Sequence, residues 1–293
     1  MKKIFAIFAA LVLGLFSACT STREVETVQL QSEDVLDHAD FSLMIDLPRG
    51  GKGALEEIRN TVMDVVDSEL AYMLSYEGER VFPAYAGDAA RTDDWFEYYR
   101  DNTRKRLEQM ALEEVSEREA LILSDADLSP EEKKDMLESV PRWDYDYQFE
   151  LVCQTPRYVV FRSLAFIYLG GAHGGVAGAG PLTVDKRSGA LLTDWFLPDA
   201  QEKMQDLLVA GLLDYYSGVE GEMTREALLD HLFIEDGVIP LPQWYPMPSE
   251  DGLDLCYQQY EIASYAEGMP SMVIPYKDVA PFLTPAAREL LKI

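Results

Sequence analysis

Residues 145–169 carry the strand pattern that most restricts the folds open to this chain. From Tyr145 to Cys153, aromatic and apolar residues alternate with polar ones, which indicates a strand with one buried face and one wet face. After a turn at 155–157, residues 158–169 are apolar at nearly every position, which is typical of a strand inside a sheet. Two such strands in succession predict a sheet at the centre of the fold.

Helical periodicity surrounds this strand pair. Apolar residues recur at three- and four-residue steps from 55 to 73, and a second helix is expected from about 93 to 123. Ser129 and Glu132 have capping-box spacing, with Pro130 at the first helical position, and predict a short helix that ends near 139. Further helices are expected at 199–216, 222–232 and 285–291.

The remaining strands are short. They are expected at 41–47, in a hairpin of 182–185 with 190–193, and at 255–262 and 271–275. This order lacks a regular βαβ alternation and predicts an α+β fold, with a mostly antiparallel sheet packed with helices. The N-terminal and C-terminal halves are expected to share one sheet or to pack tightly, because the first strand needs a partner in the later sheet.

The N-terminus resembles a bacterial lipoprotein signal. Two lysines precede an apolar run from Ile4 to Leu15, which is too short to span a bilayer. Residues 16–19 (FSAC) resemble a lipobox, so Cys19 is expected to be lipidated after removal of residues 1–18. The alternative is an ordinary secretory signal cut after Ala18. Either signal predicts export, and the lipobox predicts membrane anchoring in the bacterial cell envelope, facing the periplasm or the outside.

Three segments are predicted after the signal. Residues 19–38 are polar without a clear period and are interpreted as a tether. Residues 39–140 form an N-terminal α+β region, and residues 141–293 form a C-terminal domain. Cys153 and Cys256 could pair in an oxidising compartment or stay as buried free thiols, and both alternatives remain open.

The charge balance restricts the partners. The chain has 52 acidic against 25 basic residues, a net charge of −27. Such a surface repels phosphate backbones and excludes a general nucleic-acid binder. It allows a cationic protein partner, although the same charge is also typical of a protein that is simply soluble.

Few residues stand out as carriers of chemistry. Of three histidines, only His173 has a special setting, the loop Gly170–Gly175 (GGAHGG). That loop could present His173 for acid/base work or ligand contact, or it could be a demanding turn whose imidazole bonds to the backbone. There is no G-x-S-x-G, HExxH, P-loop, CxxC or complete calcium loop, so no catalytic residue, metal or cofactor is predicted.

A second loop, Pro240–Pro246 (PLPQWYP), is rich in proline and aromatic residues. Such loops often expose a contact surface, which would make Trp244 and Tyr245 ligand-binding residues. Packing of the loop on the fold is the equal alternative.

Two blocks together resemble a known family. Residues 163–174 (SLAFIYLGGAHG), with the following hairpin, and residues 257–276 (YQQYEIASYAEGMPSMVIPY) are similar to the C-terminal domain of the lysozyme-binding anti-sigma factor RsiV. A similar domain lies outside the catalytic part of some peptidoglycan deacetylases. The resemblance covers residues 145–291 well and residues 40–140 more loosely. It implies an envelope α+β domain that, in the anti-sigma member, recognises lysozyme without catalysis.

These observations predict a non-catalytic binding module on an envelope lipoprotein. Its partner is expected to be lysozyme or another cationic protein, or a cell-wall glycan. The ligand-binding residues are predicted to be Gly170, Gly171, His173, Trp244, Tyr245, Tyr260 and Tyr265. The alternative is an envelope hydrolase that acts on peptidoglycan or glycan through the GGAH loop.

Overall fold

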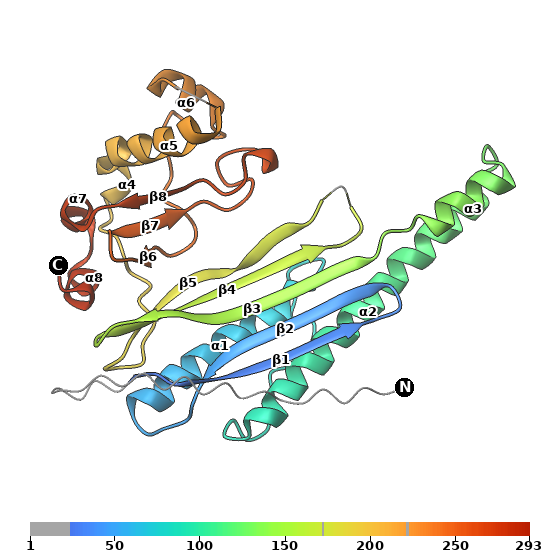
Figure 1. Cartoon of the computed structure of the whole chain (residues 1–293), viewed down its shortest axis with the longest axis horizontal. Coiled ribbons are helices and arrows are strands. Elements are labelled where there is room, and N and C mark those ends of the chain that lie inside the picture. Colours follow the sequence, from blue (N-terminus) through green and yellow to red (C-terminus); the bar gives the residue numbers. More distant parts are fainter. Residues whose placement is uncertain (1–23, 172, 221–222) are drawn as a thin grey trace.

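A computed structural model describes residues 24–171, 173–220 and 223–293 and has an α+β architecture with two sheets (Figure 1). The larger sheet has the order β1-β2-β3-β4-β5. Its strands are β1 (Thr27–Val35), β2 (Ala39–Pro48), β3 (Trp143–Gln154), β4 (Tyr158–Tyr168) and β5 (Gly175–Asp185). Neighbours are antiparallel except for β2 and β3, which are parallel. The predicted α+β fold is therefore confirmed, with a mixed main sheet.

Two long helices cover one face of this sheet: α1 (Ala54–Met73) and α2 (Thr92–Ser124) (Figure 1). The alternation predicted for β3 is confirmed, since Tyr145, Tyr147 and Phe149 are fully buried against these helices. No helix of the described residues lies across the other face, and we call it the open face (Figure 1). The short helix α3 (Pro130–Glu138) continues from the end of α2, begins with the predicted capping box and buries no residue.

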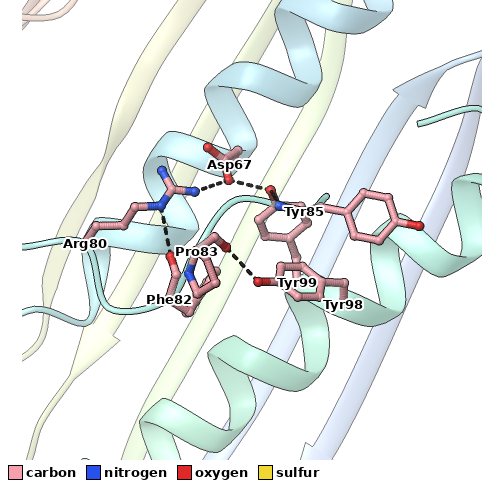
Figure 2. Close-up of polar contacts among 7 residues, drawn as sticks. All are labelled: Asp67, Arg80, Phe82, Pro83, Tyr85, Tyr98 and Tyr99. Atoms are coloured by element: carbon pink, nitrogen blue, oxygen red, sulfur yellow. Dashed lines mark hydrogen bonds and ion pairs between the residues drawn. The ribbon is translucent and has the colours of Figure 1, made fainter. Parts of the chain in front are cut away.

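The irregular segment between α1 and α2 is held by a polar cluster (Figure 2). Asp67 of α1 forms an ion pair with Arg80 of the segment and accepts the hydroxyl hydrogen of Tyr99 of α2. The Tyr99 oxygen in turn accepts the Tyr85 backbone N–H at 3.1 Å, and the Tyr98 hydroxyl donates to the Pro83 carbonyl at 2.7 Å. These bonds lie among residues of the segment and the two helices, so we assign the cluster a structural role.

The rest of the chain builds a second, smaller layer on the β5 edge (Figure 1). Its sheet has the antiparallel order β6-β7-β8. The strands are β6 (Met247–Pro248), β7 (Leu253–Cys256) and β8 (Ser271–Ile274). The helices are α4 (Ala200–Lys203), α5 (Gln205–Glu220), α6 (Arg225–His231), η1 (Tyr265–Glu267), α7 (Tyr276–Val279), η2 (Ala280–Phe282) and α8 (Pro285–Leu291).

The predicted tether is corrected by the structure. Residues 27–35 are strand β1, paired along its whole length with β2, and His38 lies in the turn between these strands. The strand was not predicted because most residues of β1 are polar, and an edge strand with one open face needs few apolar side chains. Only Leu30 of this strand is buried in the core. Cys19 lies outside the described residues.

The division near 140 also differs from the structure. Two buried clusters divide the molecule, one from Val25 to Val184 and the other from Trp195 to Ala287. The boundary predicted between 140 and 141 falls inside the first cluster, because β2 and β3 are neighbours in one sheet. The halves therefore share a sheet, as expected, but the hydrophobic cores separate about fifty residues later.

Two predicted strands have different limits. The hairpin at 182–193 has a long first arm, β5, that begins at Gly175, while its second arm is a single bridge between Val184 and Leu191. The strand predicted at 255–262 ends at Cys256, and residues 257–262 continue without strand structure.

Cys153 and Cys256 are both free and half-buried. Burial raises the pKa of the Cys256 thiol to about 11, which disfavours the reactive thiolate. Within residues 24–171, 173–220 and 223–293, no helix is both long and apolar enough to cross a membrane.

Candidate functional site

His173 lies in the connection between β4 and β5 and contacts two tyrosines of the second layer. Its ring stacks on Tyr265 with 3.7 Å between ring centroids and an interplanar angle of 17°. Its Nε2 lies 3.0 Å from the Tyr260 hydroxyl. We call His173, Tyr260 and Tyr265 the ring cluster, and it joins the two layers of the molecule.

Both tyrosines are presented by the segment between β7 and β8. Tyr265 begins η1, whose end is held by a bond from the Tyr215 hydroxyl to the Glu267 carbonyl at 2.8 Å. Tyr260 adopts φ +65°, which is uncommon for a bulky residue, and remains 58% exposed. An exposed ring held in a costly backbone conformation is typical of a contact residue.

The contacts of His173 define its tautomer. Nδ1 lies 2.9 Å from the Gly174 carbonyl, which can only accept, so Nδ1 carries the hydrogen. In the neutral ring Nε2 therefore accepts from the Tyr260 hydroxyl. Across the described residues, His173 has no contact with a carboxylate, serine or cysteine, so the acid/base interpretation has no geometric partner there.

Aromatic residues of β4 extend the ring cluster onto the open face. The Phe166 ring packs on Gly174, where a Cβ would lie 2.3 Å from the ring. The Tyr168 hydroxyl donates to the Gly171 carbonyl at 3.1 Å. Phe166 is 41% exposed. Apolar surface therefore continues from the ring cluster to the strand.

A row of carboxylates lies beside these aromatic residues. The register pairs Tyr168 with Asp144 and Phe166 with Asp146, and it pairs Asp144 with Asp40 on β2. Directly paired residues of neighbouring strands point to the same face. Three carboxylates thus lie together on the open face, next to the aromatic residues.

These three carboxylates are incompletely neutralised. Burial raises the pKa of Asp144, and the charges of Asp146 and Asp40 raise it further. Asp40 pairs with Arg142 at 2.9 Å. Asp146 accepts one bond, from Gln148 at 2.9 Å, while its Oδ1 is buried without a hydrogen-bond partner among the described residues. A cationic hydrogen-bond donor placed here would give the Asp146 Oδ1 a partner and reduce the repulsion among the three carboxylates.

Carboxylates dominate the charged residues of the open face, six against the single arginine Arg162, and neutral polar and apolar side chains lie among them. The residues that share it on β1 to β4 are Gln29, Gln31, Glu33, Val35, Asp40, Ser42, Met44, Asp46, Asp144, Asp146, Gln148, Glu150, Arg162, Leu164, Phe166 and Tyr168. Of the two cationic groups at this face, Arg162 is paired with Glu150, and Arg142 with Asp40. Among the described residues, the open face therefore offers carboxylates, not free cations, to a partner.

The structure brings together some of the predicted site residues and separates others. His173, Tyr260 and Tyr265 meet, and Gly170 and Gly171 shape the loop below them, Gly170 with φ +75°. Trp244 is only 8% exposed, and its indole N–H donates to the Gly178 carbonyl at 2.9 Å. Tyr245 packs against both buried clusters. Trp244 and Tyr245 are thus packing residues, and among the described residues neither makes a polar or ring contact with the ring cluster.

Sequence reasoning did not identify Phe166 or the carboxylates at 40, 144 and 146 as site residues. The alternation in β3 was a usable signal, because it assigned Asp144 and Asp146 to the wet face. Their proximity to Asp40 follows from the pairing of β2 with β3, which joins residues about a hundred positions apart.

Comparisons with known proteins agree with this architecture. Residues 220–277 match the family DUF3298, described as a protein of unknown function. That segment carries the DUF3298 signature. It contains Tyr260 and Tyr265 but not His173. No curated protein matches the chain.

Two crystal structures have a similar fold. A DUF3298 family member from Bacteroides fragilis is 21% identical, with a TM-score of 0.56 over 92% of this chain and 98% of that one. A DUF3298 family protein from Pseudomonas aeruginosa PAO1 is 16% identical, with a TM-score of 0.53 over 91% of this chain and 97% of that one. At these identities the likeness shows the fold alone.

Proposed function

We propose that this chain is a non-catalytic binding module of the bacterial cell envelope that captures a cationic protein. The observation that carries the proposal is the continuity of the ring cluster, the exposed Phe166 and the carboxylates of the open face. Lysozyme is the partner of choice, because the resemblance to the lysozyme-binding anti-sigma domain suggests it. Lipid anchoring through Cys19 would hold the module at the membrane.

The aromatic part of this surface supplies contact area. Energetic hot spots of interfaces are enriched in tyrosine, tryptophan and arginine that lie in a desolvated centre. Tyr260 and Phe166 offer large rings at low conformational cost, because neighbouring residues already hold both rings. An arginine or lysine of a partner could stack on these rings and reach the carboxylates beside them.

The acidic part supplies steering. A net charge of −27 attracts a cationic protein, and the carboxylates at 40, 144 and 146 concentrate negative charge beside the rings. Binding should therefore weaken with salt. The Debye length falls from about 30 Å at about 0.01 M salt to about 8 Å at about 0.15 M salt. At the higher salt concentration the carboxylates therefore attract a cationic partner only at close range.

The test is the affinity of the full chain for lysozyme at these two salt concentrations. We expect binding at low salt that weakens at high salt. Tyr260→Ala and the double variant Asp144→Asn with Asp146→Asn should each weaken binding at least about fivefold, a loss of about 1 kcal/mol that only a minority of interface residues reach. The aspartate variant should also have a flatter salt dependence.

A matched control removes the same charge from the opposite side of the molecule. Glu113→Gln with Glu117→Gln on α2 should lower affinity much less than the open-face variant. Equal losses in both double variants would mean that only net charge matters. Failure of lysozyme to bind the parent chain even at low salt would rule out lysozyme as the partner.

A further inference from the structure

A cavity of about 480 Å³ lies far from the ring cluster. It forms where segments that are distant in the sequence meet. The start of α1, the β3–β4 turn and the turn after β5 line it together with α8. Its volume is in the range of small-molecule sites. None of the residues proposed above for protein binding lines it.

The cavity is cationic in a strongly anionic protein. Lys52, Arg157, Lys186 and Arg187 line it, against two carboxylates. Both carboxylates engage Arg187, with Glu289 at 3.4 Å and Asp185 at 3.8 Å. Since the whole chain carries −27, a local excess of two positive charges is a concentrated anion-attracting feature.

The other three cations keep donors for a ligand. Arg157 donates through Nη1 to the Glu289 carbonyl, and Lys186 donates to Gln154 Oε1 at 2.5 Å. A guanidinium has five N–H donors and an ammonium has three, so both retain free ones. Within the part of the chain that the structure describes, the Lys52 ammonium has no hydrogen-bond or ion-pair partner.

The remaining lining is apolar. Leu55, Ile58, Pro156 and Leu290 form a hydrocarbon surface beside the cations. A small hydrated anion would leave this surface unused. A ligand with an anionic head and an apolar portion would satisfy both parts of the cavity.

The cavity lies near the N-terminal region of the chain, and this position suggests lipid headgroups as the source of such a ligand. The Val25 N–H donates to the same Gln154 Oε1 that Lys186 contacts, at 2.8 Å. Val25 follows Cys19 by six positions, and six residues span at most about 20 Å even in a fully extended chain. An anchor at Cys19, which belongs to the proposed function, would therefore keep the cavity close to lipid headgroups.

We propose that this cavity binds an amphiphilic phosphate, with the phosphate held by Lys52, Arg157 and Lys186 and the apolar portion placed on Leu55 and Ile58. The phosphate chemistry is shared by phospholipid headgroups and by free phosphate compounds. The two sources are separated by the choice of probe.

The test is calorimetric titration of the full chain at low ionic strength. The probes are dihexanoylphosphatidylglycerol below its micelle concentration, dihexanoylphosphatidylcholine and inorganic phosphate. We expect the phosphatidylglycerol to bind tighter than the zwitterionic lipid and inorganic phosphate. Equal affinity for inorganic phosphate would show that the apolar portion contributes nothing and would overturn the amphiphilic ligand, leaving only an anion site.

Variants locate the binding. Lys52→Gln with Arg157→Gln should weaken phosphatidylglycerol binding at least about tenfold, since two charge-assisted contacts are lost. The single variant Lys52→Glu, at an exposed position, should do the same without disturbing α8. Lys134→Gln on α3 is the matched control and should bind like the parent.

Two further results would overturn the proposal: a parent chain that binds none of the three probes, or a Lys52→Glu variant that binds phosphatidylglycerol as tightly as the parent. Neither result depends on lysozyme. Loss of lysozyme binding with lipid binding retained would refute the proposed function alone.

Discussion

At the scale of single residues, Glu69 is the most consequential buried group. This α1 carboxylate accepts from the Tyr147 hydroxyl at 2.7 Å, from the Ser163 hydroxyl at 2.5 Å and from the Ala179 N–H. It thereby ties the helix to β3, β4 and β5 at once. Burial raises the pKa of Glu69, and the three hydrogen bonds only partly oppose that rise.

The raised pKa predicts a specific pH dependence of stability. When the folded pKa exceeds the unfolded one, the folded state binds more protons between the two values, so the free energy of unfolding falls as pH rises through that window. Glu69→Gln stays neutral, and its amide can pair with the same hydroxyls after they rotate. We therefore compare the free energy of unfolding of the parent with that of Glu69→Gln by urea unfolding. As pH rises from 4.5 to 8, we expect the parent to lose stability relative to the variant.

Glu69→Ala tests the hydrogen bonds instead of the charge. It leaves two hydroxyls and one N–H buried without their acceptor, at a cost of about 1–3 kcal/mol for each unpaired group. We expect it to lower the free energy of unfolding more than Glu69→Gln at every pH. An unfolding free energy equal to that of the glutamine variant would contradict this account. Glu117→Gln, on the exposed side of α2, is the control for general charge effects.

At the scale of elements, two helices with similar caps have different roles. Ser129 caps α3 by accepting the Glu132 N–H at 3.3 Å, but α3 buries no residue. Thr284 caps α8 by accepting the Ala287 N–H at 3.2 Å and also donates to the Asp194 carbonyl at 2.6 Å. Thr284 is buried in the second layer, so its cap is part of the packed core.

This contrast predicts different consequences for the same kind of substitution. A cap is worth about 1 kcal/mol to its helix. Ser129→Ala should speed amide exchange in α3 without changing the global free energy of unfolding, because α3 opens independently of the core. Thr284→Ala should lower the global value by about 1–2 kcal/mol. Hydrogen exchange with urea unfolding checks both, and a global loss in Ser129→Ala would show that α3 is coupled to the core.

At the scale of the whole molecule, Trp244 links the second layer to strand β5 of the main sheet. Its N–H bonds to Gly178 of β5, and its ring lies against Gly180, where a Cβ would be 2.6 Å from the indole. Gly180 has φ +68°, so both the conformation and the close approach require glycine there. The second layer is thereby packed directly on the edge of the main sheet.

We expect Trp244→Ala to lower the free energy of unfolding by about 3–5 kcal/mol, the usual cost of truncating a buried large aromatic residue. It should also separate the unfolding of the two layers, with faster amide exchange in β7 and β8 than in β3 and β4. Trp244→Phe keeps most of the volume and should retain a single transition. Uniformly faster exchange across both layers in Trp244→Ala would contradict a joining role.

The local elements of this protein can be derived from its amino-acid sequence. Burial of one face produces an apolar period of two residues in a strand and of three to four residues in a helix. Neighbouring residues were therefore enough to predict β3, β4, α1, α2 and the α3 capping box. The family-like blocks also placed His173, Tyr260 and Tyr265 among the site residues. Each of these features depends on residues close together in the chain.

Which of these residues meet depends on the packing of the folded chain. The polar β1 became a strand because β2 offers it a full edge, and Asp40 joined Asp144 and Asp146 because β2 and β3 pair in parallel. The buried Trp244, the ring cluster and the cationic cavity likewise depend on contacts between segments far apart in the chain. Short-range patterns record which face of an element is buried but not which element covers it, and that choice is made by packing of the whole chain.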